Sequence, residues 1–183
     1  MAVATAQTLE AFMLDHPDQL WEVHHGQLRE KPEMSESHNI VIRRLTRQLI
    51  VQLDPDRYEV CMNIGRVKRS EETYYIPDVY VVPLAGPVTI RNRPYRLEVF
   101  DQPLPLVAEG WSPSTGDYDV EENLPEYMAR GDQEIWRLHP FEYTLTAWRR
   151  QPNGLYTETV FRDGIVEPIA LPGVAIDLDR LFA

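Results

Sequence analysis

The clearest pattern in the sequence runs from Leu106 to Thr115 and reads Leu-Val-Ala-Glu-Gly-Trp-Ser-Pro-Ser-Thr. Its apolar first part favours a buried strand, because strands that are covered on both faces are near-continuous apolar runs. The Ser-Pro-Ser-Thr part is typical of a loop, since proline and serine both favour turns. The segment therefore predicts a buried strand that carries a carboxylate, Glu109, close to its end.

Helical and extended patterns lie on both sides of this segment. Before it, we expect a short helix over 8–14, a hairpin of strands 20–23 and 27–31, a long helix from Ser35 to about Leu53, strands over 57–69 and 73–82, and an irregular segment over 83–101. After it, we expect a helix over 119–130 that ends at Gly131, strands over 134–138, 143–150, 155–161 and 165–168, and a last helical turn over 178–182. This mixture predicts a single domain over residues 1–183, of the α/β (α+β) class, around one sheet.

The composition is that of a globular protein. The chain has 183 residues, and 18 Lys and Arg against 29 Asp and Glu give a formal net charge of −11. A hydrophobic content of 43% and a charged content of 26% exclude a disordered chain. The single cysteine excludes a disulfide framework and a cysteine-based zinc site. The first ten residues lack a signal-peptide pattern and the longest apolar run, 79–85, is too short to cross a bilayer, so we expect a cytoplasmic protein without a membrane segment.

The negative charge is concentrated in one part of the chain. Residues 29–96 contain 12 basic and 9 acidic residues, whereas residues 98–134 contain one basic residue and ten acidic ones. A pI near 4.9 argues against a protein that coats nucleic acid non-specifically, because phosphate contacts need clustered Lys and Arg. The uneven distribution means that the total charge does not exclude a nucleic acid as a local partner.

Two acidic residues lie where strands are expected. Asp78 follows Ile76-Pro77 and leads into Val-Tyr-Val-Val, and Glu109 ends its own apolar run. A buried carboxylate is costly unless it is paired, hydrogen-bonded or bound to a cation. Two carboxylates that converge from neighbouring strands would suit Mg²⁺, which takes one or two carboxylates and keeps several waters. The simpler interpretation from spacing alone is structural: Asp78 would cap a turn and Glu109 would lie half-exposed at an edge.

Five motifs that follow one another along the chain favour the metal-site interpretation over the structural one. They are Trp21-Glu-Val-His-His-Gly-Gln-Leu28, the stretch from Pro32 to His38, Ile76-Pro-Asp-Val79, Leu106–Thr115, and the stretch from Tyr127 through Gly131 and Glu134-Ile-Trp136 to Pro140. Together they resemble the Uma-type putative restriction endonucleases, a bacterial branch of the PD-(D/E)XK nuclease superfamily. The resemblance covers nearly the full length, from about residue 8 to residue 181, and its most specific parts are Pro-Asp and Ser-Pro-Ser-Thr.

The resemblance implies a restriction-endonuclease-like fold, a central mixed β-sheet flanked by helices. It also implies a DNA endonuclease that hydrolyses phosphodiester bonds with Mg²⁺ (or Mn²⁺). By this analogy Asp78 and Glu109 bind the metal, and Glu22 adds a third carboxylate or holds the metal's waters. His38 would contact a phosphate or steady a carboxylate. Arginines would line the approach of the DNA, namely Arg43, Arg44, Arg47, Arg66 and Arg69. Because nucleases that cut both strands are often two-fold dimers, we also expect a homodimer.

The chain departs from the family pattern at the lysine that helps to deprotonate or position the attacking water. The position two after Glu109 is Trp111, and the position on the following helix where this branch carries the lysine is Asn123. Asn is neutral and cannot act as a base, although it can orient a water. We expect Asn123 to be the cap of a helix that begins at Leu124, with Glu126 completing a capping box.

Another lysine could replace the missing one. Lys31 lies near the first hairpin, and Lys68 is expected on the strand that pairs with the strand of Asp78. We include Lys68 among the candidate catalytic residues, although a solvated charge at a strand end is the simpler interpretation. The alternative function is a catalytically degenerate nuclease fold that acts as a DNA-binding or protein-interaction module, and Asn123 is the feature that supports it.

Overall fold

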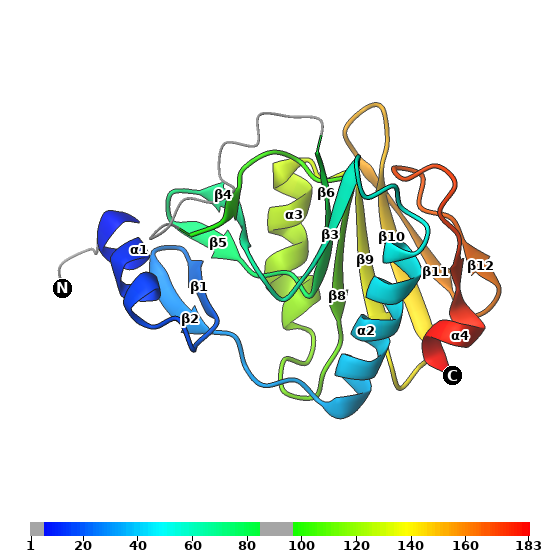
Figure 1. The fold of residues 1–183 in the computed structure, drawn as a ribbon, viewed down its shortest axis with the longest axis horizontal. Helices are drawn as coiled ribbons and strands as arrows, with labels where there is room; N and C mark the ends of the chain where they lie inside the picture. The colour runs from blue at the N-terminus through cyan, green and yellow to red at the C-terminus, as the bar shows by residue number, and fades with distance from the viewer. Residues whose placement is uncertain (1–5, 85–96) are drawn as a thin grey trace.

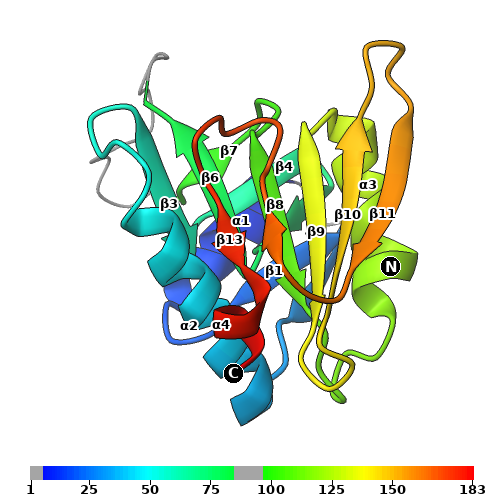
Figure 2. The same cartoon turned by 90° about the vertical axis from the view of Figure 1, so that its right-hand side faces the viewer.

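The computed structural model describes residues 6–84 and 97–183, and it consists of β-sheets with helices packed against them (Figure 1). Seen from the side, α2 and α3 lie on opposite faces of the large sheet, with α4 near α2 (Figure 2). The helices are α1 (Ala6–Asp15), α2 (Glu36–Ile50), the π-helix η1 (Asp119–Asn123), α3 (Leu124–Arg130) and α4 (Leu178–Phe182). The predicted α/β (α+β) class, with a mixed sheet flanked by helices, is confirmed.

The large sheet has six strands in the order β11-β10-β9-β8-β6-β3. Their bounds are β3 (Tyr58–Met62), β6 (Val79–Pro83), β8 (Leu106–Gly110), β9 (Glu134–His139), β10 (Thr144–Arg150) and β11 (Tyr156–Phe161). The pair β8 and β9 is parallel, and the other neighbouring pairs are antiparallel, so the sheet is mixed. All five residues of β8 are buried, which confirms the buried strand predicted around Glu109.

A second sheet was not predicted. It has five short strands in the order β2-β1-β5-β4-β7, and β12 pairs with β13 separately. The bounds are β1 (Trp21–His24), β2 (Gln27–Glu30), β4 (Arg66–Ser70), β5 (Thr73–Tyr75), β7 (Val99–Phe100), β12 (Ile165–Val166) and β13 (Ile176–Asp177). The expectation of one sheet is therefore wrong.

The physical reason lies in two bends of the backbone. Asn63 and Gly65 have φ values of 50° and 66°, in the left-handed region that Asn and Gly tolerate best. They end β3 and turn the chain into β4, so the predicted strand 57–69 is two strands in two sheets. The returning strand is divided in the same way around Pro77, because proline has no N–H to continue a ladder. One bent hairpin thus belongs to both sheets.

The core follows the alternation of side chains along the central strands. Val79, Val81, Leu106 and Ala108 belong to the cluster that includes the buried face of α2, whereas Tyr80 and Val107 belong to the cluster that includes α3. This is the period of two expected for strands that are covered on both faces. The long helix α2 begins as predicted, because the Ser35 side chain caps it by accepting a hydrogen bond from the amide of His38.

Two further expectations concern the segments between these elements. The predicted irregular segment 83–101 falls largely on residues 85–96, which lie outside the described residues, and the structure places β7 at its end. Within the described residues, no helix has both the length and the apolar character that crossing a bilayer requires.

Candidate active site

Asp78 and Glu109 lie side by side on adjacent central strands. Asp78 directly precedes β6, Glu109 is in β8, and the register that pairs Val79 with Ala108 brings the two acids together. The backbone amide of Asp78 donates a hydrogen bond of 3.1 Å to Oε2 of Glu109. Both acids are almost fully buried, with exposed fractions of 2% and 5%. The alternative of a half-exposed Glu109 is therefore wrong.

The Asp78 carboxylate accepts three hydrogen bonds. Oδ1 accepts from Nζ of Lys31 at 2.6 Å, and Oδ2 accepts from Nε2 of His38 at 2.6 Å and from the amide of Gly110 at 2.8 Å. Burial alone would raise the pKa of Asp78, but the charge of Lys31 and the bond from His38 outweigh it and hold the pKa well below its ordinary value. Asp78 is thus an ionised carboxylate in a fixed orientation.

Lys31 is the residue of this cluster that the sequence analysis left out of the candidate set. It follows β2, and its ammonium contacts Asp78, the carbonyl of Ile76 at 2.7 Å and Oδ1 of Asn63 at 3.2 Å. Burial would lower the pKa of Lys31, but the charges of Asp78, Glu109 and Glu22 outweigh burial and raise it. The available signal was chemical: Lys31 and Lys68 are the only lysines of a chain whose acids need a partner.

His38 reaches Asp78 through a gap that Gly110 leaves open. His38 is in the first turn of α2 and is completely buried. A Cβ atom on Gly110 would lie 2.5 Å from Cδ2 and 2.7 Å from Nε2 of His38, so no other residue fits without moving the ring. Since an ionised carboxylate can only accept, Nε2 of His38 must donate to Asp78. Of the two predicted roles for His38, the geometry favours steadying a carboxylate.

Glu22 lies on β1 of the small sheet, between β2 and β5 and next to this cluster. Its Oε1 accepts a hydrogen bond of 2.8 Å from the amide of Ile76, two residues before Asp78. Burial raises the pKa of Glu22, with the neighbouring charge of Lys31 acting in the opposite direction. The structure therefore brings Glu22, His38, Asp78 and Glu109 to one place, and it adds Lys31.

Tyr127 orients the second acid. Its hydroxyl group donates a hydrogen bond to Oε1 of Glu109 from the buried face of α3. The two oxygens of Glu109 therefore have different partners, the Tyr127 hydroxyl and the Asp78 amide. A single carboxylate is thus fixed from both a helix and a neighbouring strand.

Asn123 is not the helix cap that the sequence predicted. The helix does begin at Leu124, but Asn123 already has helical angles (φ −77°, ψ −41°) and its side chain makes no capping hydrogen bond. The reason is that η1 runs directly into α3, so there is no helix start at Asn123 to cap. Its side chain is buried, and Oδ1 has no hydrogen-bond partner among the described residues. Tyr127 follows four residues later, on the same face of the helix.

Lys68 lies apart from the cluster. It is on β4, which pairs with β5, the first part of the predicted strand 73–82. Asp78 precedes the second part, β6, which pairs with β3, so Lys68 is not on the strand that faces Asp78. Its ammonium forms an ion pair with Glu71 and lies 5.6 Å from the centre of the Tyr74 ring. We therefore leave Lys68 out of the proposed site.

The five arginines expected along a DNA approach have different surroundings. Arg66 donates to the carbonyl of Trp21, Arg69 pairs with Glu126, and Arg44 donates to carbonyls of the last residues. Arg43 and Arg47 are exposed on α2. Arg69 is exposed as well, but it pairs with Glu126, so among these five Arg43 and Arg47 combine exposure on α2 with a side chain that has no hydrogen-bond or ion-pair partner in the described part of the chain.

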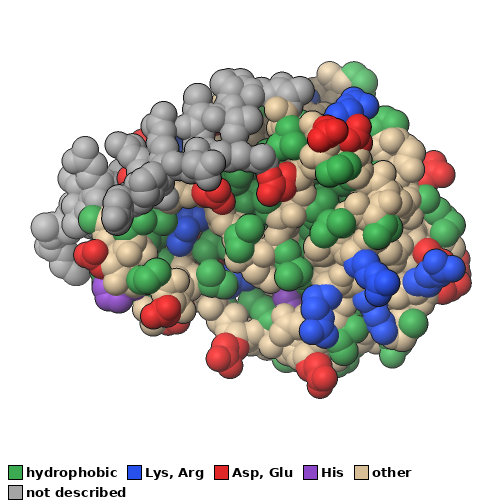
Figure 3. Space-filling view, in the orientation of Figure 1, with side chains coloured by type: hydrophobic (Ala, Val, Ile, Leu, Met, Phe, Trp, Pro, Cys, Tyr) green, Lys and Arg blue, Asp and Glu red, His purple; other side chains and the backbone are tan. Residues whose placement is uncertain are grey.

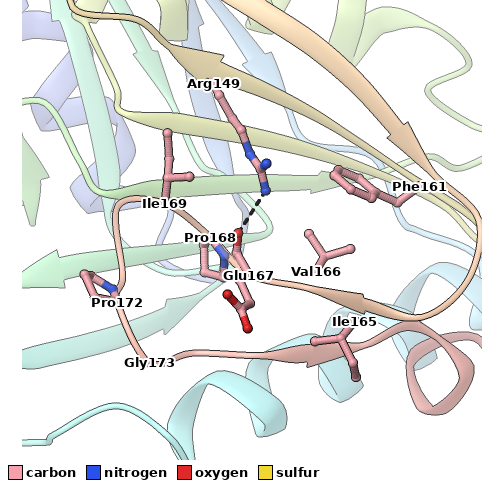
Figure 4. Close-up of a pocket in the computed structure, with 9 residues that line it drawn as sticks. All are labelled: Arg149, Phe161, Ile165, Val166, Glu167, Pro168, Ile169, Pro172 and Gly173. Atoms are coloured by element: carbon pink, nitrogen blue, oxygen red, sulfur yellow. Dashed lines mark hydrogen bonds between the residues drawn. The ribbon is translucent and has the colours of Figure 1, made fainter.

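A separate pocket lies between strands β10 and β11 of the large sheet and the C-terminal segment. Its volume is about 560 Å³, and Arg149 donates to the carbonyl of Glu167 at its wall (Figure 4). It shares no residue with the cluster of Glu22, Lys31, His38, Asp78 and Glu109, here called the acidic cluster. Its lining comes from β10, β11 and the C-terminal segment, and consists of Arg149, Phe161, Ile165, Val166, Glu167, Pro168, Ile169, Pro172 and Gly173.

The protein thus has two buried acids on adjacent central strands of a mixed sheet that is flanked by helices. The structure is similar to a crystal structure described as a putative nuclease belonging to DUF820 from Anabaena variabilis ATCC 29413, with a TM-score of 0.71 and 20% identity over 88% of this chain and 89% of that chain. The Uma2 family model, described as "Putative restriction endonuclease", matches residues 6–179. The chain therefore belongs to the Uma2 family, and the resemblance of the five motifs is confirmed. No curated protein matches the chain.

Proposed function

We propose that the protein is a DNA endonuclease that hydrolyses phosphodiester bonds with Mg²⁺ or Mn²⁺. The observation that carries the proposal is the pair Asp78 and Glu109, buried on adjacent strands and joined by the hydrogen bond from the Asp78 amide. Burying two carboxylates together is costly, and it is typical of sites that bind a cation or need a tuned acid. Membership of a family described as "Putative restriction endonuclease" supports the same reaction.

The residues present fit a hard divalent ion. Within the described residues, no three His, Cys, Asp or Glu side chains converge as a complete metal cage would require. Mg²⁺ does not need such a cage, because it takes one or two carboxylates and keeps several waters. Among the described residues, Oδ1 of Asp78 accepts one hydrogen bond, from Lys31, and so keeps a lone pair for a cation. One ammonium also faces three carboxyl groups, which favours additional positive charge.

We assign roles to the residues on this basis. Asp78 and Glu109 would hold the ion directly, and Glu22 would hold its waters. The ion would lower the pKa of a bound water and offset charge that develops on the phosphate. His38 and Gly110 keep Asp78 in orientation, and Tyr127 keeps Glu109 in orientation, so that neither acid needs to reorganise during the reaction.

DNA is the proposed substrate, and it would approach along α2. Figure 3 shows Lys and Arg side chains gathered over the part of the surface where α2 lies in Figure 1. The helix begins at the site with His38 and exposes Arg43 and Arg47 further along. Phosphate contacts by such residues position a duplex without reading its sequence. We further propose a homodimer in the cytoplasm, since a two-fold pair of sites can cut both strands.

The test is nicking of supercoiled plasmid with Mg²⁺, with Mn²⁺ and with EDTA. We expect Glu109→Gln to lower the rate at least about 100-fold, because it removes a charge from the metal-binding pair. Glu134→Gln is the matched control, since Glu134 is equally buried on the next strand but pairs with Arg149 and Trp136. Equal rates for Glu109→Gln and the parent protein would remove this site from the reaction.

The alternative is a degenerate fold that binds DNA or protein without turnover. The observation in its favour is Asn123, a neutral residue at the position of the family's lysine, whose buried Oδ1 has no partner among residues 6–84 and 97–183. A parent protein that fails to nick DNA with either metal, while Asn123→Lys gains activity, would favour this alternative.

A further inference from the structure

The ammonium of Lys31 occupies a site built for a positive charge. An ammonium group has three N–H donors, and all three acceptors are present: Oδ1 of Asp78, the carbonyl of Ile76 and Oδ1 of Asn63. Only 8% of the side chain is exposed. The Lys31 backbone is fixed as well, because its amide donates a 2.7 Å hydrogen bond to the carbonyl of Leu20.

The acceptors of Lys31 are themselves held in place. Asn63 adopts a left-handed backbone conformation, and its amide donates to the carbonyl of Asp78. The backbone of Asn63 is therefore fixed against the same residue that Lys31 contacts. Glu22 and Glu109 lie close enough for their charges to act on the ammonium. A flexible surface lysine would have none of these restraints.

The helix that follows β8 provides no such charge. Asn123 ends η1, four residues before Tyr127 and on the same helical face, and Tyr127 contacts Glu109, so this face points toward the acids. Asn123 is neutral, and the chain's only other lysine, Lys68, is engaged with Glu71 outside the cluster. Of the described lysines and arginines, Lys31 is the one whose charged end contacts Asp78.

We propose that Lys31 supplies, from the end of β2, the positive charge that Asn123 does not provide in the active site. The inference rests on the proposed nuclease function. With its three N–H donors in use, Lys31 is a positioning residue and not a proton acceptor. It fixes Asp78 Oδ1 and offsets part of the negative charge that phosphodiester hydrolysis develops beside the acids. The positive charge that the family's helix lysine provides is then supplied from another place in the fold, the end of β2.

Four proteins test this proposal: the parent, Lys31→Met, Lys31→Met with Asn123→Lys, and Lys68→Met. We expect Lys31→Met to nick DNA about 100-fold more slowly. The same variant should bind Mn²⁺ about tenfold more tightly in calorimetric titrations, because a positive charge next to the carboxylates is gone. Asn123→Lys should reverse both changes, and Lys68→Met should match the parent in both measurements.

A merely structural role for Lys31 would not give opposite changes in rate and metal affinity. Nicking by Lys31→Met within about threefold of the parent rate, or no recovery with Asn123→Lys, would overturn the proposal. Lys31→Gln keeps an N–H donor for Asp78 without the charge, and it replaces Lys31→Met if that variant does not fold.

The two proposals fail in different ways. A parent that does not nick DNA contradicts the nuclease function, and the Mn²⁺ titration then still tests Lys31. Tighter binding by Lys31→Met, reversed by Asn123→Lys, would support Lys31 as the charge of the site. Equal affinities of the parent and Lys31→Met, or binding by neither, would reject it.

Discussion

Asp78→Asn should lower plasmid nicking about 10³-fold and the free energy of unfolding by about 3–5 kcal/mol. The substitution removes a charge of the proposed metal site and leaves the buried ammonium of Lys31 without its ionic partner. The loss of the partner lowers the stability of the fold, because the charge of Lys31 then remains unpaired in a low-dielectric surrounding. Nicking assays and urea unfolding measure the two effects, with activity compared at a temperature where both proteins are folded.

Asp132→Asn provides the matched control. Asp132 is a completely buried aspartate that pairs with Arg130 at 3.0 Å and accepts from the amide of Leu104, away from the acidic cluster. We expect it to lose stability while keeping its nicking rate. Equal losses of activity in the two variants would mean that destabilisation explains both, and would count against a catalytic role for Asp78.

A comparison of the parent protein with Asp78→Asn should also show a pH dependence of stability. The pKa of Asp78 lies below its ordinary value in the folded state, so the unfolded state binds a proton first as the pH falls. The stability that Asp78 contributes is therefore fully present above the ordinary aspartate pKa of about 3.9 and is lost as the pH falls toward the folded pKa. Urea unfolding should show the difference between parent and Asp78→Asn shrinking below about pH 4.

Gly110→Ala should lower the free energy of unfolding by about 2–4 kcal/mol and the nicking rate by at least about tenfold. The added Cβ would lie 2.5 Å from Cδ2 of His38 and 3.2 Å from Cδ1 of Ile42. The ring of His38 would have to move, and its buried hydrogen bond to Asp78 would be lost. Chemical denaturation and the nicking assay measure both consequences.

A double-mutant cycle separates this clash from a general effect of alanine. His38→Ala removes the ring atoms that the new Cβ would meet. If the clash is the cause, Gly110→Ala should cost much less in the His38→Ala background than in the parent. Additive losses of stability would show that the ring of His38 is not what excludes a side chain at position 110.

Local patterns were enough to predict most of the helices and strands. The apolar stripe and the Ser35 cap indicate α2, and the uninterrupted apolar run indicates β8. The second sheet was missed because strand periodicity does not reveal which ladder a strand joins. The residues Asn63-Ile64-Gly65 carried a signal, since Asn and Gly near each other often mark a left-handed bend.

The candidate site was less accessible from the sequence. Spacing alone favoured structural roles for Asp78 and Glu109, and only the family resemblance placed them together. Lys31 is 47 residues from Asp78 in the chain, and no local pattern indicates where a long side chain at a strand end will point. The error at Asn123 has a similar origin, because a capping box and an uninterrupted helical entry have the same sequence pattern.

The bent hairpin that belongs to both sheets has a consequence for how ligands and stability are coupled. Glu22 and Lys31 come from the small sheet, whereas Asp78 and Glu109 come from the large one, and the bends at Asn63 and Gly65 form the crease between them. In the proposed site, a cation bound by Asp78 and Glu109, with its waters held by Glu22, would connect the two sheets. Because such an ion would bind the folded state only, its binding would add to the stability of the junction between the sheets. A chelator should then lower the stability of this junction.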